Sequence, residues 1–136
     1  MLKLRGYGEG KTKTKRVVYP YHTMINSRNK GARGEREFAQ ELTKMGFIAR
    51  RGCQFSGSPD SPDVAGGIFG THVEVKRVER LNIDNAMDQA IKDCGDNLPY
   101  VAHRKNGKQW LITLRFDDVF KFAQLVKTEG IKLSEL

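Results

Sequence analysis

Residues 62–77 read PDVAGGIFGTHVEVKR and place charged side chains inside two short apolar segments. The pattern predicts two strands joined by a tight turn around Gly70, because the apolar residues are bounded by glycines. Asp63 would open the first strand. Side chains alternate along a strand, so Glu74 and Lys76 would share one face of the second strand while its valines share the other. The segment therefore predicts a sheet that carries three charged groups close to the core.

The sequence on either side of this stretch alternates between helical and strand patterns. Apolar spacing and turn residues predict helices at residues 32–45, 83–94 and 117–127, and strands at residues 47–51, 63–67, 71–77, 100–104 and 109–114. We expect the first two helices to end at Gly46 and Gly95, and Asn106-Gly107 to form a hairpin turn. The order of elements predicts an α/β fold in which helices flank a central mixed β-sheet.

The positive charge of the chain is concentrated at its N-terminus. Residues 1–34 contain nine Lys or Arg against one acid, whereas the other 102 residues carry fifteen basic and fifteen acidic side chains. We expect a basic flexible arm at residues 1–29, followed by one folded domain at residues 30–136. Such an arm suits a phosphate backbone, because each bound cation releases condensed counterions. A solubilising or cloning-derived tail is the alternative.

Apolar and cysteine content exclude some classes of protein. No apolar run approaches the roughly 20 residues that span a bilayer, and the N-terminus does not resemble a signal peptide. Cys53 and Cys94 show neither metal-type pairing nor a framework of bridges, which indicates free thiols in a reducing compartment. We therefore expect an intracellular protein with no membrane segment.

Three acids and one lysine form the candidate site. Glu35 precedes Leu42 by seven positions, which returns it to within roughly 20° of the same helical face and so to the buried side of the first helix. It would join Asp63 and Glu74. Buried carboxylates need a partner, and Lys76 alone cannot neutralise three of them. A divalent ion such as Mg²⁺ would supply the missing charge and would support phosphoryl chemistry.

Several of these charged positions have a simpler explanation. Glu74 and Lys76 would also form an ordinary ion pair on a half-exposed sheet face. The Pro-Asp pair occurs a second time at Asp60, but that residue stays inside a loop, whereas apolar residues continue Asp63 as a strand. Glu37 and Glu41 are expected to face solvent on the outer side of the first helix.

The motifs KGARGEREFAQELTKMGFIARR, SGS, PDVA and VEVKR follow one another in residues 28–94. In this order the sequence resembles the PD-(D/E)xK nuclease superfamily, and within it the archaeal-type (Hjc-like) Holliday junction resolvases, in a phage or mobile-element version. The resemblance implies a restriction-endonuclease-like fold. It also implies a location in the cytoplasm of a prokaryotic or phage-infected cell.

The same resemblance implies roles for individual residues. Glu35, Asp63, Glu74 and Lys76 match the family's catalytic positions. The three carboxylates among them would hold the metal, together with the main-chain carbonyl of Val75. The residues expected to contact DNA are Lys30, Arg33, Arg50, Arg51, Ser56, Ser58, Arg77 and Gln89.

The implied activity is a Mg²⁺-dependent endonuclease, with Mn²⁺ as a substitute ion, that makes paired symmetric nicks in four-way DNA junctions. Two matched cuts require two related sites, which predicts a homodimer. Trp110, Phe120 and Phe122 are candidates for its surface, with ordinary core packing as their alternative. Two other functions stay open: a related nuclease acting on linear, nicked or flap DNA, and a non-catalytic DNA-binding protein that acts through the basic arm.

The histidines carry no predicted role. His22, His72 and His103 do not stand at metal-ligand spacing with another ligand type. His72 lies beside the strand that carries Glu74, and we expect it to have a surface or hydrogen-bonding role.

Overall fold

The computed structural model describes residues 30–52 and 62–134 of the chain. The chain divides into two units, residues 1–32 and 33–136, and the fold described below is that of the second unit. The predictions for the basic arm at 1–29, Cys53, Ser56 and Ser58 lie outside the described residues.

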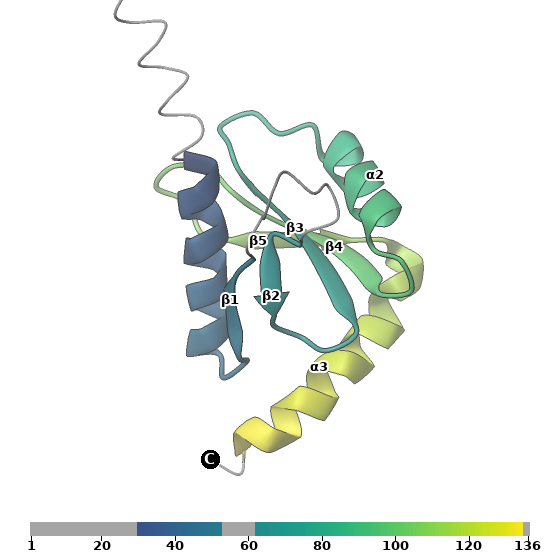
Figure 1. Ribbon diagram of the computed structural model, residues 1–136. Coiled ribbons are helices and arrows are strands. Elements are labelled where there is room, and N and C mark those ends of the chain that lie inside the picture. The colour runs from purple at the N-terminus through teal and green to yellow at the C-terminus, as the bar shows by residue number, and fades with distance from the viewer. Residues whose placement is uncertain (1–29, 53–61, 135–136) are drawn as a thin grey trace, which may run out of the picture. The chain divides into compact units, whose positions relative to one another are not determined.

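The observed elements follow the predicted order (Figure 1). A first helix, residues 30–44, precedes the other elements. These are β1 (Ala49–Arg51), β2 (Val64–Gly66), β3 (Thr71–Arg77), α2 (Ile83–Asp93), β4 (Leu98–Arg104), β5 (Leu111–Leu114), the 3₁₀ turn η1 (Phe116–Asp118) and α3 (Val119–Ser134). The α/β class with a mixed sheet and flanking helices is confirmed. The last helix is longer than predicted and begins through a 3₁₀ turn.

The strands form two sheets, where the sequence predicted one. β3, β4 and β5 form a mixed sheet in which β3 and β4 run parallel and β4 and β5 antiparallel. β1 and β2 pair antiparallel with each other, with Arg50 opposite Ala65. β2 comes shortly before β3 in the sequence, but it pairs with β1 and not with β3. β3 therefore has β4 on one side only.

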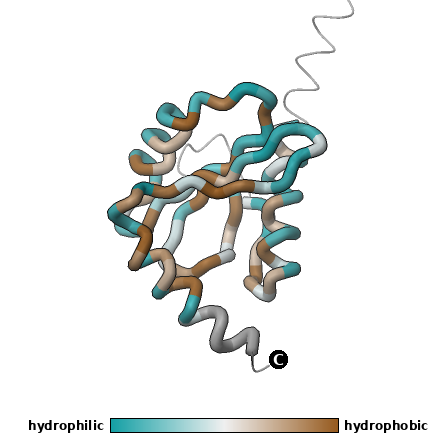
Figure 2. The backbone as a smooth tube through the Cα atoms, turned by 180° about the vertical axis from the view of Figure 1, so that it is seen from behind, coloured by the Kyte–Doolittle hydropathy of each residue, from teal (hydrophilic) through white to brown (hydrophobic). Residues whose placement is uncertain are grey.

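Helices pack on both faces of the three-stranded sheet. Phe38 of the first helix lies edge-on to Tyr100 of β4, with ring centroids 6.4 Å apart, and Phe122 of α3 contacts the same tyrosine at 5.4 Å. On the other face, Ala86 and Ala90 of α2 pack against Val101. Figure 2 shows hydrophobic residues along the central strands, between these layers.

The valines of β3 belong to the core on the side of the first helix. Because side chains alternate along the strand, His72, Glu74 and Lys76 share the opposite face. That face is the one on which α2 packs. The alternation predicted for this strand is thus observed, and it places Glu74 beneath a helix instead of on a half-exposed surface.

Local turn chemistry accounts for several of the element ends. The first helix stops where Gly46 adopts a φ of 100° and Phe47 N–H donates to the Leu42 carbonyl at 3.0 Å, which is the expected glycine cap. Asn106 and Gly107 form the predicted turn, closed by Lys108 N–H donating to the Lys105 carbonyl at 3.1 Å. Within the described ranges, no helix has the length and apolar composition needed to cross a membrane.

Two predictions for individual side chains on this unit are corrected. Glu37 is not a solvated charge: its Oε2 lies 3.1 Å from Arg77 Nε and 3.5 Å from Arg104 Nη2. The parallel pairing of β3 with β4 sets these two arginines side by side, a relation that no local pattern reveals. The first helix was predicted to extend to Met45 with that side chain on its apolar side, but Met45 follows the end of the helix and is 65% exposed.

We predict that Gly52→Ala destabilises the fold. A Cβ at Gly52 would lie 1.8 Å from the carbonyl oxygen of Pro62, at the point where Gly52 N–H donates to the Asp63 carbonyl. The ends of β1 and β2 would have to separate, at a cost in free energy of unfolding of about 2 kcal/mol. Denaturant titration measures the change.

The control is Gly31→Ala, at a helical glycine with no heavy atom within 4 Å of the new Cβ. It should leave the stability unchanged or raise it by up to about 1 kcal/mol. Equal stability of the two variants would contradict the close approach at Gly52.

Candidate active site

Asp63 connects the two sheets through its side chain. It stands immediately before β2, and its Oδ2 accepts a hydrogen bond from the Val75 backbone N–H at 2.8 Å. Among the strands formed by residues 30–52 and 62–134, none pairs with β3 on that side, so the carboxylate takes the place of a strand carbonyl as the acceptor. A buried amide needs such a partner. The hydrogen bond fixes the Asp63 carboxylate beside residue 75 and hence beside Glu74.

The surroundings of Asp63 disfavour its ionised form. Burial, followed by the charge of Glu74, raises its pKa from 3.8 to about 7. The Glu35 charge acts in the same direction, while the Val75 hydrogen bond and Lys76 oppose the rise. Glu74 and Glu35 therefore each lie close enough to Asp63 for their charges to act on its carboxylate. A cation bound here would reverse that balance, because positive charge favours the ionised carboxylate.

Glu74 is the buried acid of the site. It lies in the middle of β3 and is 7% exposed. Its Oε1 lies 2.9 Å from Lys76 Nζ, two residues along on the same face of the strand. The ion pair that served as the simpler explanation thus exists, but it sits beside Asp63. Lys76 pairs with only one oxygen of Glu74. This ion pair therefore provides no positive partner for the second oxygen of Glu74 or for the Asp63 carboxylate.

Glu35 is held by an arginine. Its Oε2 accepts from Arg51 Nε at 2.8 Å, and its side chain is 15% exposed. Arg51 ends β1, so this ion pair ties the first helix to the two-stranded sheet. The prediction that Glu35 lies on the inward side of the helix is in accord with this burial. Its carboxylate pairs with Arg51, and its negative charge also contributes to the raised pKa of Asp63.

The residues fit a divalent cation by their donor set. Carboxylate and carbonyl oxygens are the ligands that Mg²⁺ takes in proteins. With Glu35, Asp63 and Glu74 ionised against Lys76 and Arg51, the site carries one negative charge in excess. The surroundings of Asp63 support a cation, because its pKa is raised first by burial and then by the charge of Glu74, and a positive charge would offset both effects.

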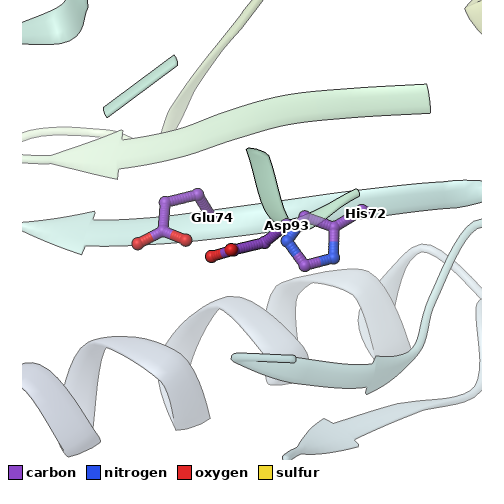
Figure 3. Close-up of side chains that lie close together, drawn as sticks. All are labelled: His72, Glu74 and Asp93. Atoms are coloured by element: carbon purple, nitrogen blue, oxygen red, sulfur yellow. The ribbon is translucent and has the colours of Figure 1, made fainter. Parts of the chain in front are cut away.

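A second group of ligand atoms lies on the α2 side of Glu74. Among groups made of described residues, the ligand atoms of His72, Glu74 and Asp93 all lie within 4.8 Å of one another (Figure 3). This set differs from the predicted one. The sequence analysis missed Asp93 and gave His72 no ligand role, because the packing of α2 on β3 brings the two together across 21 positions. The alternation of His72 and Glu74 on one strand face was the available signal.

The residues expected to contact DNA differ in their exposure. Arg33, Arg50 and Gln89 are exposed, and Lys30 is partly exposed. Arg50 and Arg51 line a surface hollow of about 470 Å³ together with Arg36 and Lys44. Arg77 is not on an exposed basic surface, because its side chain is 11% exposed and pairs with Glu37.

The pKa of Asp63 predicts how the stability of the metal-free protein depends on pH. The native carboxyl binds its proton more tightly than the unfolded chain does, so its contribution to stability is complete below about pH 4 and is lost as the pH rises through about 7. We expect the difference in unfolding free energy between the parent and Asp63→Asn to fall over this interval and to be flat above it. Denaturant titrations in a chelator from pH 4 to 8 measure it, and a difference that rises with pH would contradict the assignment.

Comparisons with known proteins give two findings. No curated protein matches the chain. A solved structure of Hjc, a Holliday junction resolvase from the archaeal hyperthermophile Archaeoglobus fulgidus, matches with 28% sequence identity and a TM-score of 0.47, over 60% of this chain and 73% of that chain.

The family model described as archaeal Holliday junction resolvase (Hjc) matches residues 26–135. This match covers the first helix, every strand and all the predicted catalytic positions. Family members are metal-dependent crossover junction endonucleases, which agrees with the acidic site. The chain therefore belongs to the archaeal Holliday junction resolvase family.

Proposed function

We propose that this resolvase is a Mg²⁺-dependent endonuclease that makes paired symmetric nicks in four-way DNA junctions by phosphodiester hydrolysis. The observation that carries the proposal is the position of Asp63, whose carboxylate is bound to the Val75 amide and has its pKa raised to about 7 beside Glu74. A divalent cation bound beside Asp63 and Glu74 would favour the ionised carboxylates and displace the proton of Asp63.

Each residue of the site would have its own role. Asp63 and Glu74 would hold the ion together with the Val75 carbonyl oxygen, and Glu35 would complete the acidic surround. When bound, Mg²⁺ supplies the positive charge that phosphodiester hydrolysis requires. Lys76, held 2.9 Å from Glu74, would orient the attacking water or the scissile phosphate. Mn²⁺ would replace Mg²⁺, because it accepts the same oxygen ligands.

DNA would approach along the basic hollow on the first helix and β1. Arg36, Lys44, Arg50 and Arg51 line it. Arg51 also pairs with Glu35, so the hollow runs up to the acidic site. Cations on this surface would bind backbone phosphates and place a phosphodiester at the carboxylates.

Two identical sites would come from a homodimer. Trp110 and Phe122, which the sequence analysis weighed as dimer contacts, pack against the core. Phe116 and Phe120, in contrast, are 87% and 85% exposed. Leu111 of β5, a few residues earlier in the sequence, is also an exposed apolar residue. Exposed aromatic side chains on successive elements are typical of an interface. We propose that the dimer forms through η1 and the start of α3.

We predict that Glu74→Gln and Lys76→Met each lower the rate of junction cleavage by about a hundredfold or more, since each removes a charge that acts on the reacting phosphate. The assay follows nicking of a synthetic four-way junction with Mg²⁺, and a chelator should abolish it. Glu41→Gln is the matched control, because Glu41 is an acid of the first helix that pairs with Lys44 at the surface.

Substrate choice is tested in the same assay with linear duplex, flap and single-stranded DNA of matched sequence. Symmetric paired nicks on the junction support the proposal. Preferential cutting of linear DNA would favour a restriction-like nuclease, and absence of Mg²⁺-dependent cleavage of any substrate would favour a binding protein.

We predict that Phe116→Glu and Phe120→Glu convert the dimer into a monomer, because a carboxylate buried at a two-fold interface meets its own copy. Light scattering of the purified protein measures the mass. Phe69→Glu, at a phenylalanine of the β2–β3 connection that is 79% exposed, should remain a dimer. A parent protein that is monomeric, or variants that stay dimeric, would contradict this surface.

A further inference from the structure

His72, Glu74 and Asp93 lie together on the face of β3 on which α2 packs. Their ligand atoms are within 4.8 Å of one another. We propose that they form a second cation site, which takes a divalent transition-metal ion and shares Glu74 with the proposed Mg²⁺ site. The inference rests on the proposed function only in the role given there to Glu74.

Two independent features of Asp93 indicate a cation. Asp93 is the last residue of α2, where the helix macrodipole is negative and disfavours a carboxylate. It also faces the carboxylate of Glu74 (Figure 3). Neither Asp93 nor His72 makes a hydrogen bond or ion pair to another residue within 30–52 and 62–134. A bound cation would relieve both the repulsion and the unfavourable helix end.

The burial of the three residues suits an ion that enters from solvent. Glu74 is 7% exposed and sits at the base of the group, His72 is partly exposed, and Asp93 is exposed. Lys76 pairs with Oε1 of Glu74, so the second oxygen is the ligand that the two proposed sites would share. The group therefore offers a rigid inner ligand and an accessible outer one, with room at the surface for water ligands.

The donor set selects the kind of ion. Mg²⁺ prefers oxygen ligands and accepts imidazole nitrogen poorly, whereas Mn²⁺ and the later first-row ions bind imidazole together with carboxylates. The site at Asp63, Glu74 and the Val75 carbonyl offers only oxygen. We therefore expect Mg²⁺ to occupy that site alone and Mn²⁺ to occupy both.

The experiment titrates the full-length protein with Mn²⁺ and follows the ion by electron paramagnetic resonance. Spin counting gives the number of bound ions, and pulsed measurements detect coupling between Mn²⁺ and an imidazole nitrogen. The parent should bind two ions per chain and show the nitrogen coupling. His72→Ala should bind one ion without coupling, and Asp93→Asn should weaken the coupled site by at least about tenfold.

Three variants serve as controls. Asp63→Asn should lose the oxygen site and keep the nitrogen coupling. His22→Ala and His103→Ala replace the other two histidines of the chain and should keep both ions and the coupling. If His72→Ala fails to fold, as judged by circular dichroism, His72→Gln tests the same point, because it retains a polar side chain but no imidazole.

The outcomes separate this inference from the proposed function. A parent protein without nitrogen coupling, or coupling that persists in His72→Ala or disappears in His103→Ala or His22→Ala, overturns the second site. If the parent does not cleave junctions with Mg²⁺ and yet shows coupling that depends on His72, the proposed function fails and the second site stands.

Discussion

The hydrogen bond from Val75 N–H to the Asp63 carboxylate is the contact on which the arrangement of the site depends. β3 is paired with β4 on one side only, and its free edge would otherwise leave a buried amide unsatisfied. By filling that position with a carboxylate instead of a strand, the fold joins its two sheets and sets Asp63 next to Glu74. The same contact explains why β1 and β2 stand apart from the main sheet: the edge of β3 that they would extend is taken up by a side chain.

This arrangement places negative charges together at a position where they add little to the stability of the fold. Glu35 is compensated by Arg51 at 2.8 Å and Glu74 by Lys76 at 2.9 Å. Asp63 accepts a hydrogen bond from an amide, and burial together with the charge of Glu74 raises its pKa to about 7. A site stabilised for its own sake would exchange that carboxylate for a neutral acceptor such as Asn. The acid at this position therefore suits a site that binds positive charge, at some cost in the stability of the metal-free protein.

Local patterns were sufficient to predict the order of the elements, the caps at Gly46 and the turn at Asn106-Gly107, because each depends on residues adjacent in sequence. The alternation of β3 also gave the faces of Glu74 and Lys76 correctly. Relations that depend on packing were not accessible. The pairing of β2 with β1 and the position of Glu37 between two arginines are properties of which strands lie side by side, and helical periodicity cannot report them. The approach of Asp93 to His72 follows from the docking of α2, for the same reason.

Side chains and backbone groups of β3 point in three directions, each with a different role. Its valines build the core with the first helix, its free edge holds Asp63, and its remaining face carries His72 and Glu74 toward α2. The first two directions position the Glu-x-Lys motif that the family shares. The third depends on a histidine two residues before Glu74 and on an acid at the end of α2, both outside the motif. Glu74 is shared by the two proposed sites. A cation on the α2 face would therefore bind the carboxylate that the nuclease site also needs. Which ion binds on that face would then change the charge at the nuclease site.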